Sequence, residues 1–560
     1  MKKLSFSFCF VLLILNFTKA QNHPKTNYYK KGVVVTAHPE ASKVGLGILK
    51  KGGNAVDAAV AVQFALAVVY PNAGNIGGGG FMVYRDYKGN TNTLDFREKA
   101  PLNSFRDMYL DEAGNPIEEK SIYGHLASGV PGSVDGMVKA HLKYGKLKWQ
   151  EVLQPALDLA KNGFSVTDKQ AKELNGQKNI FVKHNPEGTA LVKDTKWVAG
   201  DLLIQTELAN TLDLIKIKGR AGFYEGEVAD LIADYMQKNN GLITKADLKN
   251  YKPVWREPVR GNYKEYEIVT MPPPSSGGIH VIQMLNILEH YNLPEMGHNS
   301  PTYVALLAEV MKYAYADRSK YLGDPDFFEV PVAELISKGY AKEIKSRINL
   351  NEITSSDKIL PGDAMPHESM DTTHFSVADK YGNVTSNTYT LNSGFGSGIV
   401  VDGTGVLMNN EMDDFASAPG IPNQFGLIGG EANKIEPFKR PLSSMTPTIV
   451  FHENKPIIAT GSPGGSRIIT AVLQFLLNTL DFKMEISDAT VVPRIHHQWK
   501  PDVLMLEKGF DAGHASSIEA LGQPIYVSGP GTSLESLEIK NNLFYGFGDT
   551  RRPDSKAKGL

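Results

Sequence analysis

The sequence predicts an α+β fold in which two stacked β-sheets lie between outer layers of helices. Three observations predict it. Strand and helix patterns follow one another at the N-terminal end, helical patterns dominate from about residue 132 to 340, and short strand patterns return from Thr373 onward. Helix patterns recur among those late strands, so both halves of the chain supply both kinds of element. The chain has 560 residues, of which 42% are hydrophobic, so it can bury a large core.

The N-terminal elements are the clearest. Residues 32–38 (GVVVTAH) are typical of a buried strand, and residues 39–53 carry apolar side chains at helical spacing up to a Gly-Gly stop. Residues 54–71 are apolar on nearly every side, which predicts a helix buried in a large core. Residues 75–86 and 92–101 predict a glycine-rich turn that leads into a hairpin.

The later elements are shorter. Residues 351–371 are polar and rich in turn formers, and the break at 371/372 is typical of a cut site rather than of a domain linker. Helices are expected at 466–480 and 484–492. Strands are expected at 266–271, 374–379, 384–391, 405–410, 446–452 and 455–461.

The first twenty residues predict an export signal. Two lysines precede an apolar run from about Phe8 to Phe17, and a small residue, Ala20, follows it. The run is shorter than the roughly 20 apolar residues of a membrane span, although an uncleaved N-terminal anchor is the alternative. We therefore expect residues 1–20 to be removed and the protein to be exported, to a periplasm or outright by secretion.

Composition excludes several classes of function. The only cysteine, Cys9, lies inside the signal, so the mature chain has no disulfide, no cysteine nucleophile and no cysteine-bound metal. The net charge is −2 and no basic block stands out, so a nucleic-acid partner is not expected. His496 and His497 are adjacent and point apart on any regular element, and no H-E-x-x-H occurs, so no metal site is predicted.

Thr372 stands where the polar segment meets a strand pattern. A threonine hydroxyl inside a chain is nearly inert, but at the first position the residue's own α-amine, with a pKa of about 8, can take its proton. This requires a cut after Asp371, which the same hydroxyl can make by attacking the Asp371 carbonyl to give an ester that water opens. On pattern alone, the alternative is an ordinary β-branched strand residue.

Two further segments carry candidate chemistry. Gly464 and Gly465 precede a helix pattern, so their backbone N–H groups can hold a phosphate or the oxyanion of an acyl-transfer intermediate, or can form an ordinary helix-start turn. Carboxylates gather in NNEMDDF, where they either hold an ammonium group or face solvent; they are Glu411, Asp413 and Asp414.

Together these segments resemble the gamma-glutamyltranspeptidases, which are N-terminal-nucleophile hydrolases. The resemblance spans roughly residues 30 to 550. The motifs that carry it are GGNAVDAAVA, GNIGGGGFMV, DFREKAP, MPPPSSGGI, TTHFSVAD, TYTLNSGFGSGIV, LMNNEMDDF, KRPLSSMTPTIV, GSPGGSRIIT and PRIHHQW.

The resemblance implies a four-layer αββα sandwich that is made as one precursor and cut into two subunits that stay together. Here the subunits would be residues 21–371 and 372–560, and together they would form one αββα unit. It also implies transfer of a γ-glutamyl group, without a cofactor, from glutathione or a related amide to water or an amino acid.

The resemblance also implies roles for residues at the reacting centre. Thr372 matches the nucleophile of both self-cleavage and catalysis, and Thr390 matches the threonine that positions it. Gly464 and Gly465 match the oxyanion-hole pair. Thr373 is expected to support the site, with a hydroxyl that bonds the nucleophile.

A clamp for the amino-acid head of the donor is implied as well. Arg97 matches the arginine that grips the α-carboxylate, a group that suits a fork of donors. Ser443 and Ser444 are expected to add hydrogen bonds to the same carboxylate. The residues that match those around the α-ammonium are Asn392, Glu411 and Asp414.

One position departs from the family pattern. The loop between DDF and KRPLSSM resembles a lid over the glutamyl pocket, but Phe425 stands where some bacterial members have tyrosine. Its ring can still cover the pocket, but it has no hydroxyl. Two rival functions are a cephalosporin or glutaryl acylase of the same fold and an uncleaved, inactive binding protein.

Overall fold

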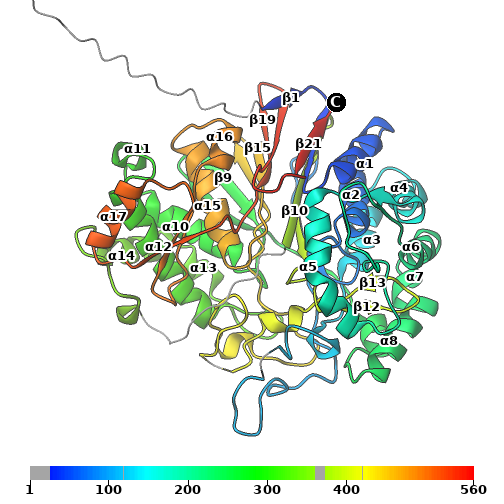
Figure 1. Cartoon of the computed structure of the whole chain (residues 1–560). Helices are drawn as coiled ribbons and strands as arrows, with labels where there is room; N and C mark the ends of the chain where they lie inside the picture. Colours follow the sequence, from blue (N-terminus) through cyan, green and yellow to red (C-terminus); the bar gives the residue numbers. More distant parts are fainter. Residues whose placement is uncertain (1–25, 118, 360–371, 419) are drawn as a thin grey trace, which may run out of the picture.

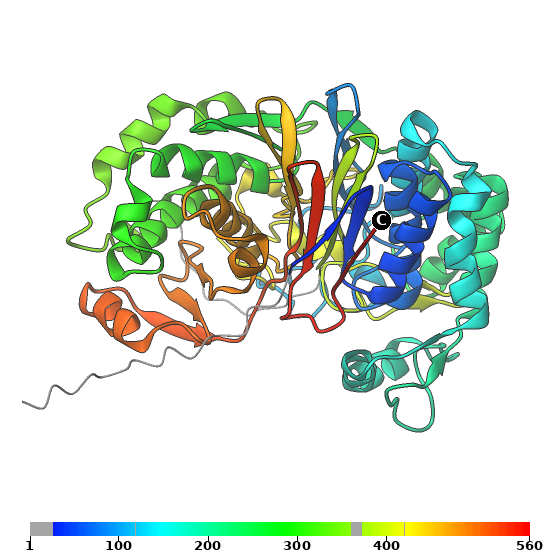
Figure 2. The same cartoon turned by 90° about the horizontal axis from the view of Figure 1, so that it is seen from above.

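The computed structural model describes residues 26–117, 119–359, 372–418 and 420–560. The predicted export signal and Asp371, on the N-terminal side of the predicted cut, lie outside the described residues. The described chain forms four layers, with two β-sheets in the middle and helices on both outer faces (Figures 1 and 2). The predicted αββα sandwich is confirmed.

Each central sheet has seven strands in the part of the chain that the structure describes. The first runs in spatial order through β1 (Asn27–Tyr29), β20 (Leu543–Gly548), β19 (Glu535–Lys540), β15 (Lys455–Thr460), β14 (Thr448–His452), β9 (Tyr266–Thr270) and β8 (Val259–Tyr263). The second runs through β21 (Lys556–Gly559), β2 (Gly32–Thr36), β10 (Thr372–Asp379), β11 (Val384–Thr390), β3 (Gly79–Arg85), β4 (Thr91–Asp95) and β7 (Val254–Arg256).

The two sheets pack face to face through alternate side chains. In β2, Val33 and Val35 join the apolar cluster between the sheets, whereas Val34 joins the cluster beneath the helices. Side chains of a strand alternate between its two faces, so a run of valines fills both cores at once. This explains why residues 32–36 are buried throughout and why three consecutive valines stand at their centre.

One helical layer covers the sheet that contains β10. Its central member, α2, is buried along its whole length, as its sequence predicts, and the Asn54 side chain caps its N-terminus. The layer comprises α1 (Pro39–Lys50), α2 (Ala55–Val69), α3 (Ser133–Tyr144), α4 (Trp149–Asn162), α5 (Asp168–His184), α6 (Thr206–Lys218), α7 (Ala221–Tyr224), α8 (Glu227–Lys238) and α9 (Lys245–Asn250).

The second helical layer covers the other sheet, and its core is a separate apolar cluster built around α10, α12 and α15. It comprises α10 (Gly277–Leu288), α11 (Leu293–Met296), α12 (Pro301–Tyr321), α13 (Val332–Leu335), α14 (Lys338–Arg347), α15 (Arg467–Leu480), α16 (Ile486–Val491) and α17 (Ala512–Ala520). Across the described ranges, no helix is both long and apolar enough to span a bilayer.

Short elements complete the fold. They are β5 (Phe164–Ser165), β6 (Leu202–Leu203), β12 (Val400–Val401), β13 (Val406–Leu407), β16 (Ile495–His496), β17 (Leu504–Glu507), β18 (Ile525–Ser528) and 3₁₀ turns at His125–Ala127, Ser356–Lys358, Glu411–Asp414 and Glu431–Asn433.

Three sequence-based expectations need correction. The strand expected at 405–410 shrinks to β13, because Asn409 turns its amide to the carbonyls of Gly77 and Gly129. The helix expected at 484–492 is the shorter α16. Strands β7 and β8 lie in a region predicted to be mostly helical.

Candidate active site

The candidate nucleophile lies at the open end of a hairpin. Strand β10 begins at Thr372, two residues before the strand expected at 374–379, and Thr372 pairs directly with Thr390 of β11. The Thr372 hydroxyl donates a 3.4 Å hydrogen bond to the Thr390 hydroxyl, which also accepts from the backbone N–H of Asn392 at 2.8 Å. Thr390 is therefore the side-chain partner of the candidate nucleophile, Thr372.

Thr373 does not take the role expected for it. Adjacent residues of a strand point to opposite faces, so Thr373 turns away from the Thr372 side chain. Its hydroxyl is buried and has no hydrogen-bond partner among the described residues. The expected bond from Thr373 to the nucleophile is therefore wrong for this structure.

Arg552 is a contact that sequence reasoning missed. Its two terminal nitrogens each donate a 3.2 Å hydrogen bond to the Thr372 carbonyl oxygen. Arg552 is the second of two arginines in GDTRRPDS, 180 residues downstream of Thr372, and no motif in that segment predicts the contact. Two hydrogen bonds from one guanidinium to this carbonyl oxygen restrict the orientation of the backbone that carries the candidate nucleophile.

The glycine pair precedes α15 in the left-handed backbone region. Gly464 has φ 132° and Gly465 has φ 53°. A Cβ at Gly464 would lie 2.5 Å from the Gly531 carbonyl oxygen, so only glycine fits there without a shift. Neither amide donates a hydrogen bond to another residue in the described ranges. Two free N–H groups beside a nucleophile can stabilise an oxyanion.

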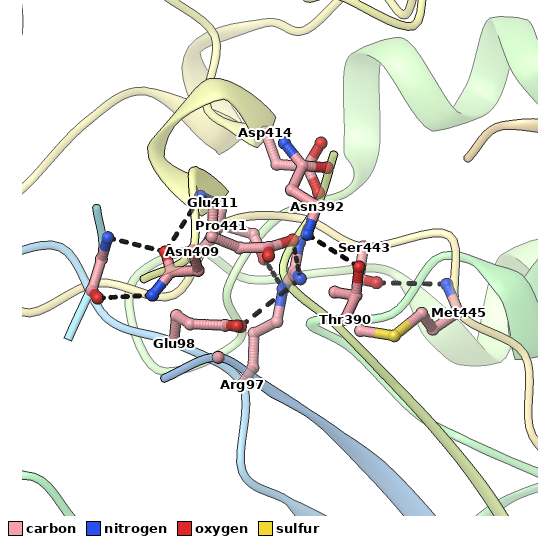
Figure 3. Close-up of polar contacts among 12 residues, drawn as sticks. Arg97, Glu98, Thr390, Asn392, Asn409, Glu411, Asp414, Pro441, Ser443 and Met445 are labelled. Carbon is pink, nitrogen blue, oxygen red and sulfur yellow. Dashed lines mark hydrogen bonds and ion pairs between the residues drawn. The ribbon is translucent and has the colours of Figure 1, made fainter. Parts of the chain in front are cut away.

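Arg97 is the centre of a buried charge cluster (Figure 3). It follows β4, is 0% exposed and makes ion pairs with Glu411 and Asp414. Glu98 lies 3.5 Å from the same guanidinium. The Arg97 Nε donates to the Pro441 carbonyl at 3.3 Å, which holds the fork beside the tandem serines.

The cluster holds more carboxyl groups than positive charge. Three carboxyl groups, those of Glu98, Glu411 and Asp414, surround the single guanidinium. Burial raises the pKa of each of the three above its ordinary value, because desolvation penalises the charged form. Such a surplus favours a neighbouring ammonium group, whereas the Arg97 fork favours a carboxylate. The cluster can therefore bind both charges of an amino acid.

One small pocket brings the candidates together. Gly464, Thr373 and Asp413 do not line it, but ten of the predicted site residues do: Arg97, Thr372, Thr390, Asn392, Glu411, Asp414, Phe425, Ser443, Ser444 and Gly465. The remaining walls are apolar and come from Leu427, Met445 and Ile468. The nucleophile candidate and the charge cluster therefore face the same space.

Phe425 closes one side of this pocket. Its ring lies against Gly465, where a Cβ would come within 2.7 Å of the ring. The Phe425 carbonyl accepts a 3.1 Å hydrogen bond from Gln498, and Asn423 of the same loop donates to Asp414 at 3.1 Å. This position is compatible with the expectation that the phenylalanine ring covers the pocket. The hydrogen bond with Gln498 is made by the Phe425 backbone, not by a side-chain hydroxyl.

Comparison with known proteins decides the family. The family model described as gamma-glutamyltranspeptidase matches residues 41–559. The chain belongs to the gamma-glutamyltranspeptidase family. A glutathione hydrolase proenzyme of Escherichia coli (strain K12) is 49% identical over 542 residues, which are 95% of this chain and 92% of that protein.

Solved structures agree with this membership of the gamma-glutamyltranspeptidase family. The Helicobacter pylori gamma-glutamyltranspeptidase structure is 47% identical with a TM-score of 0.57, and the match covers 59% of this chain and 96% of that chain. A cephalosporin acylase from Bacillus halodurans has a TM-score of 0.84 at 26% identity, over 98% of this chain and 99% of that one. The acylase therefore shares the fold at a much lower identity.

Proposed function

We propose that this chain is the precursor of an exported γ-glutamyl transfer enzyme. It cuts itself between Asp371 and Thr372 and then transfers γ-glutamyl groups from glutathione or other γ-glutamyl compounds to water or to amino acids and dipeptides. The name of the E. coli relative, glutathione hydrolase proenzyme, supports both the donor and the processing. The observation that carries the proposal is the single pocket that joins Thr372 to the Arg97 charge cluster.

The clamp would hold the donor by its two charges. Arg97 and the hydroxyls of Ser443 and Ser444 face the α-carboxylate, and the carboxylates of Glu411 and Asp414 face the α-ammonium, with Asn392 beside them. Binding both charges fixes the glutamyl head and leaves the γ-carbonyl near Thr372. A donor without the ammonium group loses one half of this clamp.

The chemistry would proceed in two acyl transfers. The freed α-amine of Thr372 takes the proton of its own hydroxyl, and Oγ1 attacks the γ-carbonyl carbon. The amides of Gly464 and Gly465 hold the oxyanion until the C–N bond breaks and the leaving amine takes the proton. Water or an acceptor amine then attacks the Thr372 ester in the same way and releases the product.

The sheet topology explains why two cut subunits would stay together. Strands from both sides of the predicted cut pair with each other in both sheets. In one sheet β2 pairs with β10 and β11 with β3, and in the other β1 pairs with β20 and β14 with β9. Cutting the bond before Thr372 leaves these ladders intact. We therefore propose that residues 21–371 and 372–560 remain a heterodimer, after export to the periplasm or the medium.

Two substrates distinguish the proposal from its rivals. A γ-glutamyl anilide carries the α-ammonium, and a glutaryl anilide lacks it. Because a hydrogen bond to a charged group contributes about 1.5–3 kcal/mol, kcat/KM should favour the γ-glutamyl anilide by about 10- to 150-fold. Preference for the glutaryl anilide would favour the acylase, and turnover of neither would favour an inactive binding protein.

A further inference from the structure

A second arginine lies behind the pocket and does not line it. Arg318 belongs to the last turn of α12, in the helical layer that also contains α10, and is 5% exposed. Its Nη2 donates a 3.3 Å hydrogen bond to the Ser444 hydroxyl oxygen, and its Nε donates a 3.0 Å bond to the Ser276 hydroxyl oxygen. Ser444 lines the pocket, and Ser276 donates to the carbonyl of Ser443, which also lines it.

Arg318 has no carboxylate partner within 4.0 Å among the described residues. The other fully buried arginines nearby, Arg97 and Arg440, each have one. Burial lowers the pKa of Arg318 to about 10, so the side chain still carries its charge at neutral pH. Asp414 acts on this charge only from beyond contact distance. A buried charge without a contacting counter-ion is costly, and a bound anion close by would offset that cost.

The bond to Ser444 determines where that hydroxyl can donate. A serine hydroxyl has one hydrogen and two lone pairs. Because Arg318 donates to the Ser444 oxygen, the hydrogen must point away from the guanidinium, and Ser444 lines the pocket beside Arg97 and Thr372. The hydroxyl hydrogen is thus free for an anion in the pocket.

The bond to Ser276 fixes the neighbouring backbone. Ser276 lies in the PPPSSGG turn that begins α10, and both its amide and its hydroxyl donate to the Ser443 carbonyl at 2.8 Å. Arg318 therefore contacts one tandem serine directly and orients the other through Ser276. The PPPSSGG turn has no part in the proposed reaction, and this contact gives it one.

We propose that Arg318 is a positioning residue for the α-carboxylate of the donor: it aims the Ser444 hydroxyl at that carboxylate and supplies a second positive charge behind Arg97. The inference rests on the proposed function. It predicts that substitution of Arg318 weakens turnover only of donors that carry the carboxylate, because its hydrogen bonds reach only Ser444 and, through Ser276, Ser443.

The test compares two donors across matched variants of the processed enzyme. γ-Glutamyl anilide has the carboxylate, and 4-aminobutanoyl anilide is the same donor without it. Arg318→Met should raise KM for γ-glutamyl anilide about 10- to 100-fold and change kcat/KM for 4-aminobutanoyl anilide less than about 2-fold. Arg318→Lys keeps the charge and loses the forked guanidinium, so its KM for γ-glutamyl anilide should lie between those of the wild type and Arg318→Met. Lys320→Met, at the exposed end of the same helix, is the control and should match the wild type.

Three results would overturn the inference. Equal losses on both donors would mean a merely structural role, and no loss on either would mean no role. If Arg318 acts through Ser444, the double variant Arg318→Met/Ser444→Ala should have a KM for γ-glutamyl anilide no higher than that of the worse single variant. Additive effects of the two substitutions would contradict this action. If Arg318→Met fails to fold, Ser276→Ala removes one Arg318 contact and should raise KM for the carboxylated donor alone. A wild type that releases no anilide would refute the proposed function itself.

Discussion

The hydroxyl of Thr372 lies 3.4 Å from the hydroxyl of Thr390, its direct partner across the β10–β11 ladder. Thr390→Val keeps the branched shape and removes the acceptor. We expect processed Thr390→Val enzyme to lose about 10-fold in kcat, which corresponds to the roughly 1.4 kcal/mol of one hydrogen bond. Thr390→Ser, which retains the hydroxyl, is the control, and equal kcat values in the valine and serine variants would contradict this role.

Asp414 is the acidic residue that joins the clamp to the lid loop, through Arg97 and Asn423. Asp414→Asn keeps the shape and removes the charge that we propose faces the donor ammonium. The KM for γ-glutamyl anilide should rise by about 10- to 100-fold, because a hydrogen bond to a charged group is lost. The KM for glutaryl anilide, which has no ammonium group, should not change. An equal rise in KM for both substrates would contradict the clamp model.

Gly465, whose amide is one of the two proposed oxyanion donors, lies against the Phe425 ring. In Gly465→Ala the new Cβ would fall 2.7 Å from that ring at a φ of 53°, so the amide and the ring must move apart. We expect kcat to fall by at least about 100-fold, as when an oxyanion donor is lost. Gly522→Ala is the matched control, because Gly522 also has a positive φ, of 93°, but a Cβ there meets no atom within 4 Å. Similar activity in the two variants would refute the role of Gly465.

Glu535 predicts a pH dependence of stability. It is buried, its Oε1 accepts from Ser533 and Ser555, and burial raises its pKa to about 7. The folded state therefore binds more protons than the unfolded state between about pH 4.5 and 7, and stability falls as pH rises through that window. The full cost, on the order of 3 kcal/mol, is present only above about pH 7.

Glu535→Gln should remove this cost and keep both serine bonds. The melting temperature of the variant should exceed that of the wild type at pH 8, and the difference should shrink toward pH 5. Glu519→Gln, on the exposed surface of α17, controls for the amide substitution itself. A Glu535→Gln variant that is less stable than the wild type at pH 8 would contradict the assignment.

The sequence predicted those features of the fold that depend on local residue patterns. The valine run of β2, the buried α2 and the glycines before α15 each follow from periodicity or from backbone preference, and the structure has them in place. The motifs also led to the pocket residues, including Arg97 and Asp414.

The contacts that the sequence did not predict are long-range. Arg552 and Arg318 lie far along the chain from Thr372 and Ser444, and no spacing rule connects an arginine to a partner that the fold brings to it. Strand β7 is three residues long and only partly buried, so it has too few residues to set a period. Thr373 was misplaced because the resemblance was followed and the two-residue strand alternation was not.

The central claim is that Thr372 becomes a chain terminus and then the nucleophile. Intact-mass measurement and N-terminal sequencing of the exported wild type and of Thr372→Ala test it most directly. The account predicts two chains for the wild type, the smaller beginning Thr-Thr-His-Phe, and one uncut, inactive chain for the variant. An uncut but active wild type, or a processed Thr372→Ala protein, would contradict it.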